Sequence, residues 1–177
     1  MRWEWQTVAC IASGPSLSED DCLTVQVSGI KSIAVNSSWQ IARFCDVIYA
    51  GDYDWWKENI EDIDITAERW TCSERAADVY GLNHHRKRGA YNTGLRAVEL
   101  AIEFGASRIL LLGYDGTVKH GTHWHGDHKN TKNPDEDRCI KWRQQFASMN
   151  RKGAEIINCS VGSAINCFPK ARIEDVL

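Results

Sequence analysis

Four of the chain's six histidines lie within one short stretch, HGTHWHGDHKN (120–130). Imidazole nitrogens and carboxylate oxygens are common ligands of Zn²⁺, and close spacing allows one loop to supply several of them. Imidazole also titrates near neutral pH, so a histidine can transfer protons without a special environment. The stretch therefore has three interpretations: a metal site, a catalytic loop that carries a base, or a surface loop without a chemical role.

The metal interpretation has a specific pattern behind it. Residues 123–128 read HWHGDH, or H-x-H-x-D-H, which resembles the metal-binding signature of the metallo-β-lactamase family. That family needs further histidines downstream, and no histidine follows His128 here. We therefore reject that family. A simpler metal site stays open, because alternate residues of an extended loop point to the same side. Its ligands would be His123, His125, Asp127 and His128.

Length and composition limit the class of protein. The 177 residues are enough for a single domain with a substantial core. The net charge of −3 gives no electrostatic reason to expect nucleic acid or an acidic membrane as a partner. No apolar run is long enough to span a membrane, and MRWEWQTVAC at the N-terminus lacks the apolar region of a signal peptide. Seven cysteines without C-x-x-C spacing indicate reduced, mostly buried thiols and therefore a cytoplasmic location.

The elements that position the histidines are predicted from apolar runs and helical spacing. Apolar runs predict strands within 7–13, 31–36, 46–52, 68–73, 107–115 and 154–160. The runs do not alternate, which is typical of strands covered on both faces. Helical spacing predicts a short helix in SSWQIARF (37–44) and longer helices at 93–105 and 135–153, both ending at glycine.

Alternation of strands and helices predicts a single-domain α/β fold, a Rossmann-like, doubly wound and mainly parallel sheet. In the helix at 93–105, the core face is expected to carry Leu95, Val98, Ala101 and Ile102. In the helix at 135–153, it is expected to carry Ile140, Phe146 and Met149. The remaining long stretch, 114–134, has no periodicity and contains the histidines, so we expect it to be an active-site loop.

Ligands bind beyond the carboxyl ends of the strands in open parallel sheets. The predicted strands end in small, hydroxyl, amide and carboxylate residues, which suit a nucleotide or a phosphorylated ligand. The candidates are Ser13, Gly14, Pro15, Ser16, Asn36, Gly51, Asp52, Asp115 and the segment 160–163, with Thr93 and Gly94 at the start of a helix.

Gly14-Pro15-Ser16 is the most informative of these segments. Glycine lets the backbone approach a ligand, proline is favoured at the first helical position, and a helix N-terminus offers N–H groups to an anion. The alternative is a plain helix cap, in which the acidic residues 19–21 complement the helix dipole.

The other candidates also have structural alternatives. Asn36 could bond a base or a sugar, and Asp52 a ribose hydroxyl or a metal, but both could instead cap the following helices. Trp55 and Trp56 could stack on a base, although core packing is favoured. The run HHRKR (84–88) could meet phosphates or form a solvated loop.

Several segments resemble one known group of proteins. They are ASGPSL (12–17), VNSSW (35–39), NTGLRAVELAIEFGASRILLLGYD (92–115) and INCSVGSAINCFPKARIEDVL (157–177). The pattern is similar to the Rossmann-like group that joins 6-hydroxymethylpterin diphosphokinase-like proteins with small bacterial sialyltransferases that use CMP-sialic acid. In those sialyltransferases a stretch like HYxGHSKN follows the same strand, and HWHGDHKN (123–130) lies in the corresponding place.

The resemblance implies that His123 is a general base that deprotonates an acceptor hydroxyl during metal-free glycosyl transfer. It also implies that Asn36 and Thr93 contact a nucleotide and that Gly14 lies in the nucleotide loop. Asp52 stands where the sialyltransferases usually have asparagine, and this chain is much shorter than those enzymes. Transfer of sialic acid itself is therefore not inferred.

We predict a transferase that binds a nucleotide or nucleotide-sugar and moves a glycosyl or diphosphoryl group to a small acceptor. Gly14 to Ser16 would contact the phosphates, and Asn36 and Asp52 the nucleoside. His123 would be the base, Thr93 and Asp115 would support it, and His125 and His128 are further catalytic candidates. Lys129 or Arg88 would stabilise the leaving phosphate.

Glycosyl transfer of this kind would need no cofactor. Diphosphoryl transfer would require Mg²⁺, with Asp52 or Asp115 as ligands. Two alternatives stay open: a nucleotide-binding protein without catalytic activity, and a metal-dependent hydrolase that uses the histidine loop.

Overall fold

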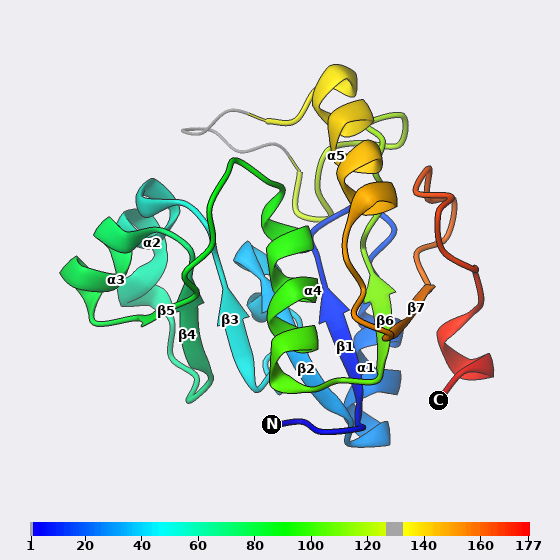
Figure 1. Cartoon of the computed structure of the whole chain (residues 1–177), viewed down its shortest axis with the longest axis horizontal. Helices are drawn as coiled ribbons and strands as arrows, with labels where there is room; N and C mark the ends of the chain where they lie inside the picture. The colour runs from blue at the N-terminus through cyan, green and yellow to red at the C-terminus, as the bar shows by residue number, and fades with distance from the viewer. Residues whose placement is uncertain (1, 127–132) are drawn as a thin grey trace.

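Seven parallel strands form one sheet in the order β5-β4-β3-β2-β1-β6-β7 (Figure 1). The computed structural model describes residues 2–126 and 133–177. The strands are β1 (Thr7–Ile11), β2 (Lys31–Val35), β3 (Val47–Tyr49), β4 (Glu68–Thr71), β5 (Asn83–His84), β6 (Arg108–Leu112) and β7 (Glu155–Asn158). Each strand pairs in parallel with its neighbours in this order. The prediction of a Rossmann-like α/β sheet is confirmed.

Helices cover both faces of this sheet (Figure 1). They are α1 (Glu19–Ser28), α2 (Tyr53–Asn59), α3 (Glu74–Tyr80), α4 (Thr93–Phe104) and α5 (Glu136–Ser148), with short 3-10 turns η1 (Asn36–Gln40), η2 (Ile60–Asp62) and η3 (Ile173–Asp175). The predicted core face of α4 is confirmed, and Gly105 ends this helix in a left-handed conformation with φ of 101°. Phe146 of α5 is buried as predicted, whereas Ile140 is exposed and Cys139 takes its place in the core.

Two predicted helix boundaries, one start and one end, were wrong. The helix after β1 begins at Glu19, not at Pro15, because Ser18 is its N-cap and accepts a hydrogen bond from the Asp21 N–H. Helix α5 ends at Ser148, before Gly153. Beyond it the Asn150 side chain accepts a bond from the Lys152 N–H, a local turn that competes with helix continuation.

The strands are buried on both faces, which explains their continuous apolar runs. Val8 and Cys10 of β1 face the core cluster that contains α4 and Phe146 of α5. Ala9 and Ile11 face the opposite cluster, which contains apolar residues of α1, α2 and α3. Burying one large aliphatic side chain contributes roughly 1.5–3 kcal/mol, so a two-faced core accounts for much of the driving force for folding.

The cysteines behave as core residues. All seven are free thiols, and five of them are buried. Burial raises the pKa of the Cys10, Cys22 and Cys45 thiols to about 12, so these thiols stay protonated and pack as small apolar groups.

The chain reverses its direction of travel across the sheet between β1 and β6. Strands β1 to β5 proceed to one side, and the chain then returns through α4 to place β6 against the other side of β1. The loops that follow β1 and β6 therefore leave the sheet side by side at its carboxyl edge. In doubly wound folds, this reversal is where ligands bind.

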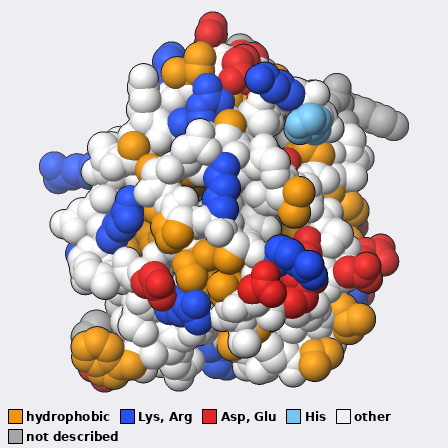
Figure 2. All heavy atoms as spheres, turned by 90° about the vertical axis from the view of Figure 1, so that its right-hand side faces the viewer, with side chains coloured by type: hydrophobic (Ala, Val, Ile, Leu, Met, Phe, Trp, Pro, Cys, Tyr) orange, Lys and Arg blue, Asp and Glu red, His pale blue; other side chains and the backbone are white. Residues whose placement is uncertain are grey.

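None of the helices in the described ranges is long and apolar enough to cross a membrane. Lys, Arg, Asp and Glu side chains are interspersed on the face beside β7 and the C-terminus (Figure 2). This distribution agrees with the small net charge of −3.

Candidate functional site

A cleft of about 450 Å³ lies at the carboxyl edge of the sheet, where the loops after β1 and β6 diverge. This volume is in the range of small-molecule sites. The predicted site residues that line it are Ser13, Gly14, Pro15, Asn36, Asp52, Thr93, Gly94, Asp115 and His123. These positions come from six segments of the sequence, so the fold itself brings the predicted residues together.

The histidine loop is fastened to the end of β1 by two hydrogen bonds. His123 Nδ1 lies 3.0 Å from Ser13 Oγ, and the Trp124 N–H donates to the Ser13 carbonyl at 3.0 Å. The Trp124 side chain packs against the core cluster that contains Ala9 and Ile11 of β1. The His123 ring is thereby held at the cleft wall.

The two nitrogens of His123 have different surroundings. Nε2 is buried in the protein, whereas Nδ1 faces Ser13, which also lines the cleft. Of the two nitrogens, Nδ1 is therefore the one that contacts a residue of the cleft lining.

His125 stacks on His123, with ring centroids 5.1 Å apart and planes 4° from parallel. It is exposed and is not part of the cleft lining. The predicted candidates Asp127, His128 and Lys129 lie outside the described residues. Within 2–126 and 133–177, no three His, Cys, Asp or Glu side chains gather as a metal site.

Asp115 anchors the loop that follows β1. Its carboxylate accepts a hydrogen bond from the Ser16 N–H at 3.0 Å and a second, short one from the Ser16 hydroxyl. Burial raises the pKa of Asp115, and the bonds from Ser16 oppose this rise. The Asp115 carboxylate therefore accepts the hydrogen bond of the Ser16 N–H, the group that the sequence had suggested as a donor to phosphate.

The rest of the Gly14 to Ser16 segment is also bonded internally. The Gly14 N–H donates to the Gly113 carbonyl, and Pro15 has no N–H. A Cβ on Gly14 would collide with that carbonyl oxygen and lie 2.8 Å from the Asp115 carboxyl group. Glycine is therefore required at position 14 because the backbone there lies close to the loop that follows β6.

The segment 160–163 supports the same loop from behind. Ser160 Oγ accepts a bond from the Tyr114 N–H, and Ser163 Oγ donates to the Tyr114 carbonyl. Both serines are buried and do not line the cleft. They fix the backbone that carries Asp115.

Asp52 is placed differently from an ordinary helix cap. It occupies the N-cap position of α2, but its side chain makes no capping hydrogen bond. The carboxylate instead reaches the cleft, where surrounding protein and the nearby Asp54 raise its pKa, and Arg138 acts in the opposite direction. A carboxylate that does not cap its helix is available to a ligand.

Asn36 begins η1 in a left-handed conformation with φ of 50°, which asparagine tolerates better than most residues. Its Oδ1 is buried and accepts no hydrogen bond from the described residues. Such an acceptor costs free energy when left unpaired.

The N-terminus of α4 forms another part of the wall. Asn92 caps the helix by accepting a bond from the Leu95 N–H. The first N–H groups of a helix have no acceptor within it, and here they belong to Thr93 and Gly94, which line the cleft. Gly94 also lets the Tyr114 ring approach, because a Cβ there would lie 2.9 Å from that ring.

Tyr91, Arg138 and Trp142 are among the cleft residues that were not predicted from the sequence. Arg138 and Trp142 stand four residues apart on α5, a helix for which only the apolar positions were considered. Trp142 stands three residues after Cys139 and four before Phe146, on the same side of α5 as these two buried residues, and this spacing was the available signal.

The remaining candidates have structural roles. Trp55 and Trp56 pack edge to face at 5.0 Å in the core, as favoured, and Trp55 also touches the cleft. In the HHRKR run, His85 is buried and Lys87 forms an ion pair with Glu103. Arg88 does not line the cleft; its carbonyl accepts a bond from Arg96.

Comparison with known proteins adds no family to these observations. No protein-family model, curated protein or solved structure matches the chain. The site is therefore interpreted from its own geometry.

Proposed function

We propose that the cleft binds a nucleotide or nucleotide-sugar and that the protein transfers a glycosyl or diphosphoryl group from it to a small acceptor. The observation that carries the proposal is the common cleft of His123, Asp52 and the α4 N-terminus at the point where the sheet reverses. In this proposal, His123 serves as a base, Asp52 as a nucleoside contact and the helix end as an anion site, and all three share one ligand-sized space.

In this proposal, His123 takes the proton of the acceptor hydroxyl. Because Nε2 is buried, Nδ1 is the receiving atom, and Ser13 Oγ either yields its place to the acceptor or relays the proton. A donor phosphate would lie at the N–H groups of Thr93 and Gly94, where helix dipole and free donors favour negative charge. The N–H groups of Gly14 and Ser16 are left out, since each already donates within the protein.

Magnesium would be held by Asp52 in this proposal. Mg²⁺ that accompanies a nucleotide is commonly held by one or two carboxylates together with phosphates and water. Asp52 fits this role better than Asp115, because Asp115 is already bonded to Ser16. The experiment described below therefore includes conditions for both the metal-free and the Mg²⁺-dependent reaction.

A second candidate function is nucleotide binding without catalysis. Arg138 is the single Lys or Arg side chain among the described residues of the cleft lining. A departing phosphate is usually stabilised by several cationic groups or metal ions, so a sparse set favours binding over transfer.

Thermal shift tests the proposal. The protein is melted with CMP, CDP, UDP, AMP, ADP, ATP and GDP, each in EDTA and in Mg²⁺, since a ligand of the folded state raises the Tm. Stabilisation by a cytidine nucleotide in EDTA supports metal-free glycosyl transfer, and stabilisation by ATP only in Mg²⁺ supports diphosphoryl transfer. A Tm that no nucleotide changes, but that EDTA alone lowers, contradicts the proposal and indicates a metal site.

Catalysis is then separated from binding with His123→Ala, with His84→Ala on edge strand β5 as a matched control. Turnover lost only in the first variant supports His123 as the base. Turnover retained there shows that another group serves. Nucleotide binding without turnover of any donor by the wild type supports the second candidate.

A further inference from the structure

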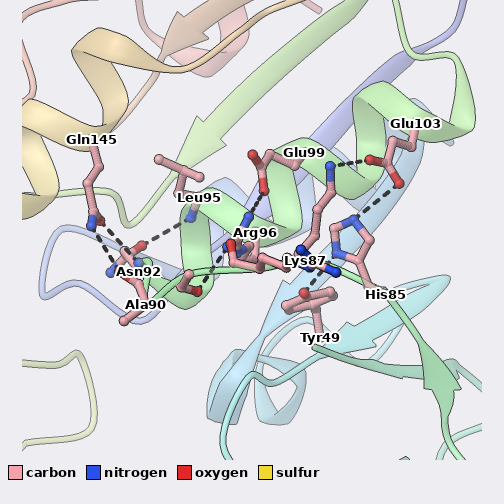
Figure 3. Close-up of polar contacts among 12 residues, drawn as sticks. Tyr49, His85, Lys87, Ala90, Asn92, Leu95, Arg96, Glu99, Glu103 and Gln145 are labelled. Carbon is pink, nitrogen blue, oxygen red and sulfur yellow. Dashed lines mark hydrogen bonds and ion pairs between the residues drawn. The ribbon is translucent and has the colours of Figure 1, made fainter. Parts of the chain in front are cut away.

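The segment between β5 and α4, residues 85–92, is called the strap here. It runs along α4 (Figure 3). It ends at the cleft, where Tyr91 and Asn92 are part of the lining. Tyr91 is 49% exposed, a large exposed fraction for an aromatic side chain. The contacts around it show how that ring is held.

Gln145 of α5 bonds the strap on both sides of Tyr91. Its Oε1 accepts from the Asn92 N–H at 3.2 Å, and its Nε2 donates to the Ala90 carbonyl at 3.2 Å. Figure 3 shows this amide reaching the strap from α5. The pair of bonds fixes the backbone of Tyr91 against α5.

The Tyr91 ring is braced from the side of α4. The Arg96 guanidinium lies 4.4 Å from the ring centroid, and Gly89 packs so closely that a Cβ there would lie 2.8 Å from the ring. Arg96 is 3% exposed and is itself held by Glu99 and by the Arg88 and Gly89 carbonyls. One side of the ring is therefore occupied by rigid neighbours, while about half of the residue stays open to solvent.

Helix α5 brings a second aromatic ring to the same wall. Arg138, Trp142 and Gln145 are spaced by four and three residues and so lie on one face of the helix. Two of them line the cleft and the third bonds the strap beside Tyr91. Trp142 thus lies about one turn before the residue that bonds the strap, and Arg138 about one turn earlier still.

Asp52 and Asp54 line the same cleft. Carboxylates repel phosphate, but they accept hydrogen bonds from the ring N–H and amino groups of a heteroaromatic base. Aromatic and arginine side chains are the usual platforms on which such bases stack. The chemistry of these aromatic and acidic residues therefore suits a flat base better than a phosphate or a saturated sugar.

We infer that Tyr91 and Trp142 form a base-stacking subsite on the wall made by the strap and α5, with Gln145 as the positioning residue that presets Tyr91. The inference deepens the proposed function, since it assigns the base end of the nucleotide to this wall and leaves the phosphate end at α4. Tyr91 is preordered by its neighbours, which lowers the entropy lost on binding.

Saturation-transfer NMR and titration test the subsite. The probes are AMP, GMP, CMP and UMP, their nucleosides, and ribose 5-phosphate. Base protons are expected to receive more saturation than ribose protons. Tyr91→Ala and Trp142→Ala are each expected to raise the Kd about tenfold, the range of a lost stacking contact. Gln145→Ala is expected to raise it less, without removing the base signal.

Two variants serve as controls. Tyr91→Phe keeps the stacking face, and Trp5→Ala removes an 80% exposed aromatic ring outside the cleft lining. Both are expected to bind within about twofold of wild type. The Tm of every variant is measured, and a lower Tm with unchanged affinity in Tyr91→Ala and Trp142→Ala counts against the subsite.

The outcomes separate this inference from the proposed function. Ribose 5-phosphate that binds as tightly as the best nucleotide overturns the base subsite while the phosphate site stands. If nucleosides bind as tightly as nucleotides and no turnover is seen, the base subsite is supported and the proposed transferase function is contradicted. Absence of binding by every probe overturns both.

Discussion

Ser13 Oγ lies 3.0 Å from His123 Nδ1, although 110 positions separate the two residues in the sequence. The contact joins the end of β1 to the loop after β6, the two segments that flank the reversal of the sheet. Its neighbour, the bond from Trp124 N–H to the Ser13 carbonyl, ties the same two segments through the backbone. Removing the serine hydroxyl should therefore remove one contact of the imidazole and leave the backbone bond of the loop in place.

Ser13→Ala is expected to leave the fold intact and to loosen the His123 ring. A hydroxyl can donate to Nδ1 or accept from it, and we expect the Ser13 hydroxyl to hold one of these two orientations, so ring ¹⁵N shifts of the wild type should show one tautomer of His123. The variant should show a mixture of tautomers, and Ser13→Thr, which keeps a hydroxyl, should resemble the wild type. Identical ¹⁵N shifts in wild type and Ser13→Ala would show that the contact does not set the tautomer.

Asp115 offers a matched pair of substitutions. Asp115→Ala leaves the Ser16 N–H without its acceptor and should lower the free energy of unfolding by about 1–3 kcal/mol. Asp115→Asn keeps an oxygen for that N–H and can donate to the Ser16 hydroxyl, so near-wild-type stability is expected. Urea unfolding at pH 7 compares the two. Equal losses in both variants would show that the loss does not come from the missing acceptor.

The same residue gives a pH dependence with a defined sign. Burial raises the pKa of Asp115 above its ordinary value of 3.8, so the folded state binds its proton more tightly than the unfolded state. As pH rises from 3.8 through the folded value, ionisation favours the unfolded state and this group's contribution to stability is lost. The stability of Asp115→Asn relative to wild type should therefore increase over that range and then level off. A constant difference between pH 4 and 7 would contradict the raised pKa.

Local sequence patterns predicted the parts of the site that lie next to strong apolar runs. Ser13, Asp52 and Asp115 follow buried strands, and parallel strands deliver their carboxyl ends to one edge. The patterns failed where a non-local contact decides the outcome. Whether the Ser16 N–H is open to a phosphate depends on Asp115, which lies 99 positions away in the sequence. Tyr91 was missed for the same reason, since its place at the cleft depends on Gln145 and Arg96.

Short helices and strands were also difficult to predict from the sequence. Helices α2 and α3 have seven residues each and β5 has two, too few for a periodic pattern to stand out. The start of α1 was misplaced because Pro15 and Ser18 are both good initiation signals, and only the bond from Asp21 N–H to Ser18 Oγ decides between them.

His85 gives a second pH dependence, in the opposite direction. It is 3% exposed, its Nδ1 lies 2.9 Å from the Tyr49 hydroxyl, and its Nε2 lies 3.2 Å from Glu103. Burial lowers the pKa of His85 below 6.5, and Glu103 only partly offsets this. The folded state therefore disfavours protonation, so the contribution of His85 is complete above pH 6.5 and is lost as pH falls through the folded pKa.

His85→Gln removes this titration and keeps groups that can bond Tyr49 and Glu103. Relative to wild type, the free energy of unfolding of the variant should be lowest near pH 7 and should rise as pH falls towards 5. Urea unfolding across this range measures the difference. A wild type that gains on the variant with falling pH would mean that the ion pair with Glu103 outweighs burial.

Arg96 is expected to contribute most to holding the strap. Its guanidinium donates to Glu99 at 2.6 Å and to the Arg88 and Gly89 carbonyls at 2.5 and 3.0 Å, and it lies over the Tyr91 ring. A lysine ammonium cannot reproduce this planar set of donors. Arg96→Ala should lower the free energy of unfolding by about 3 kcal/mol, because Glu99 and two carbonyls of the strap lose their donor and the packing of the buried Arg96 side chain is lost, and Arg96→Lys should lower it by roughly half as much.

The local effect distinguishes a strap anchor from a general core residue. Amide hydrogen exchange should accelerate in residues 86–92 of both Arg96 variants, while exchange in β1 and β6 follows only the change in global stability. Arg75→Ala is the matched control, because Arg75 lies 3.8 Å over the Tyr53 ring, and neither residue belongs to the strap. Faster exchange spread evenly over the sheet in Arg96→Lys would show that Arg96 stabilises the core as a whole. In that case the bonds of Gln145 would be left to hold Tyr91 at the cleft.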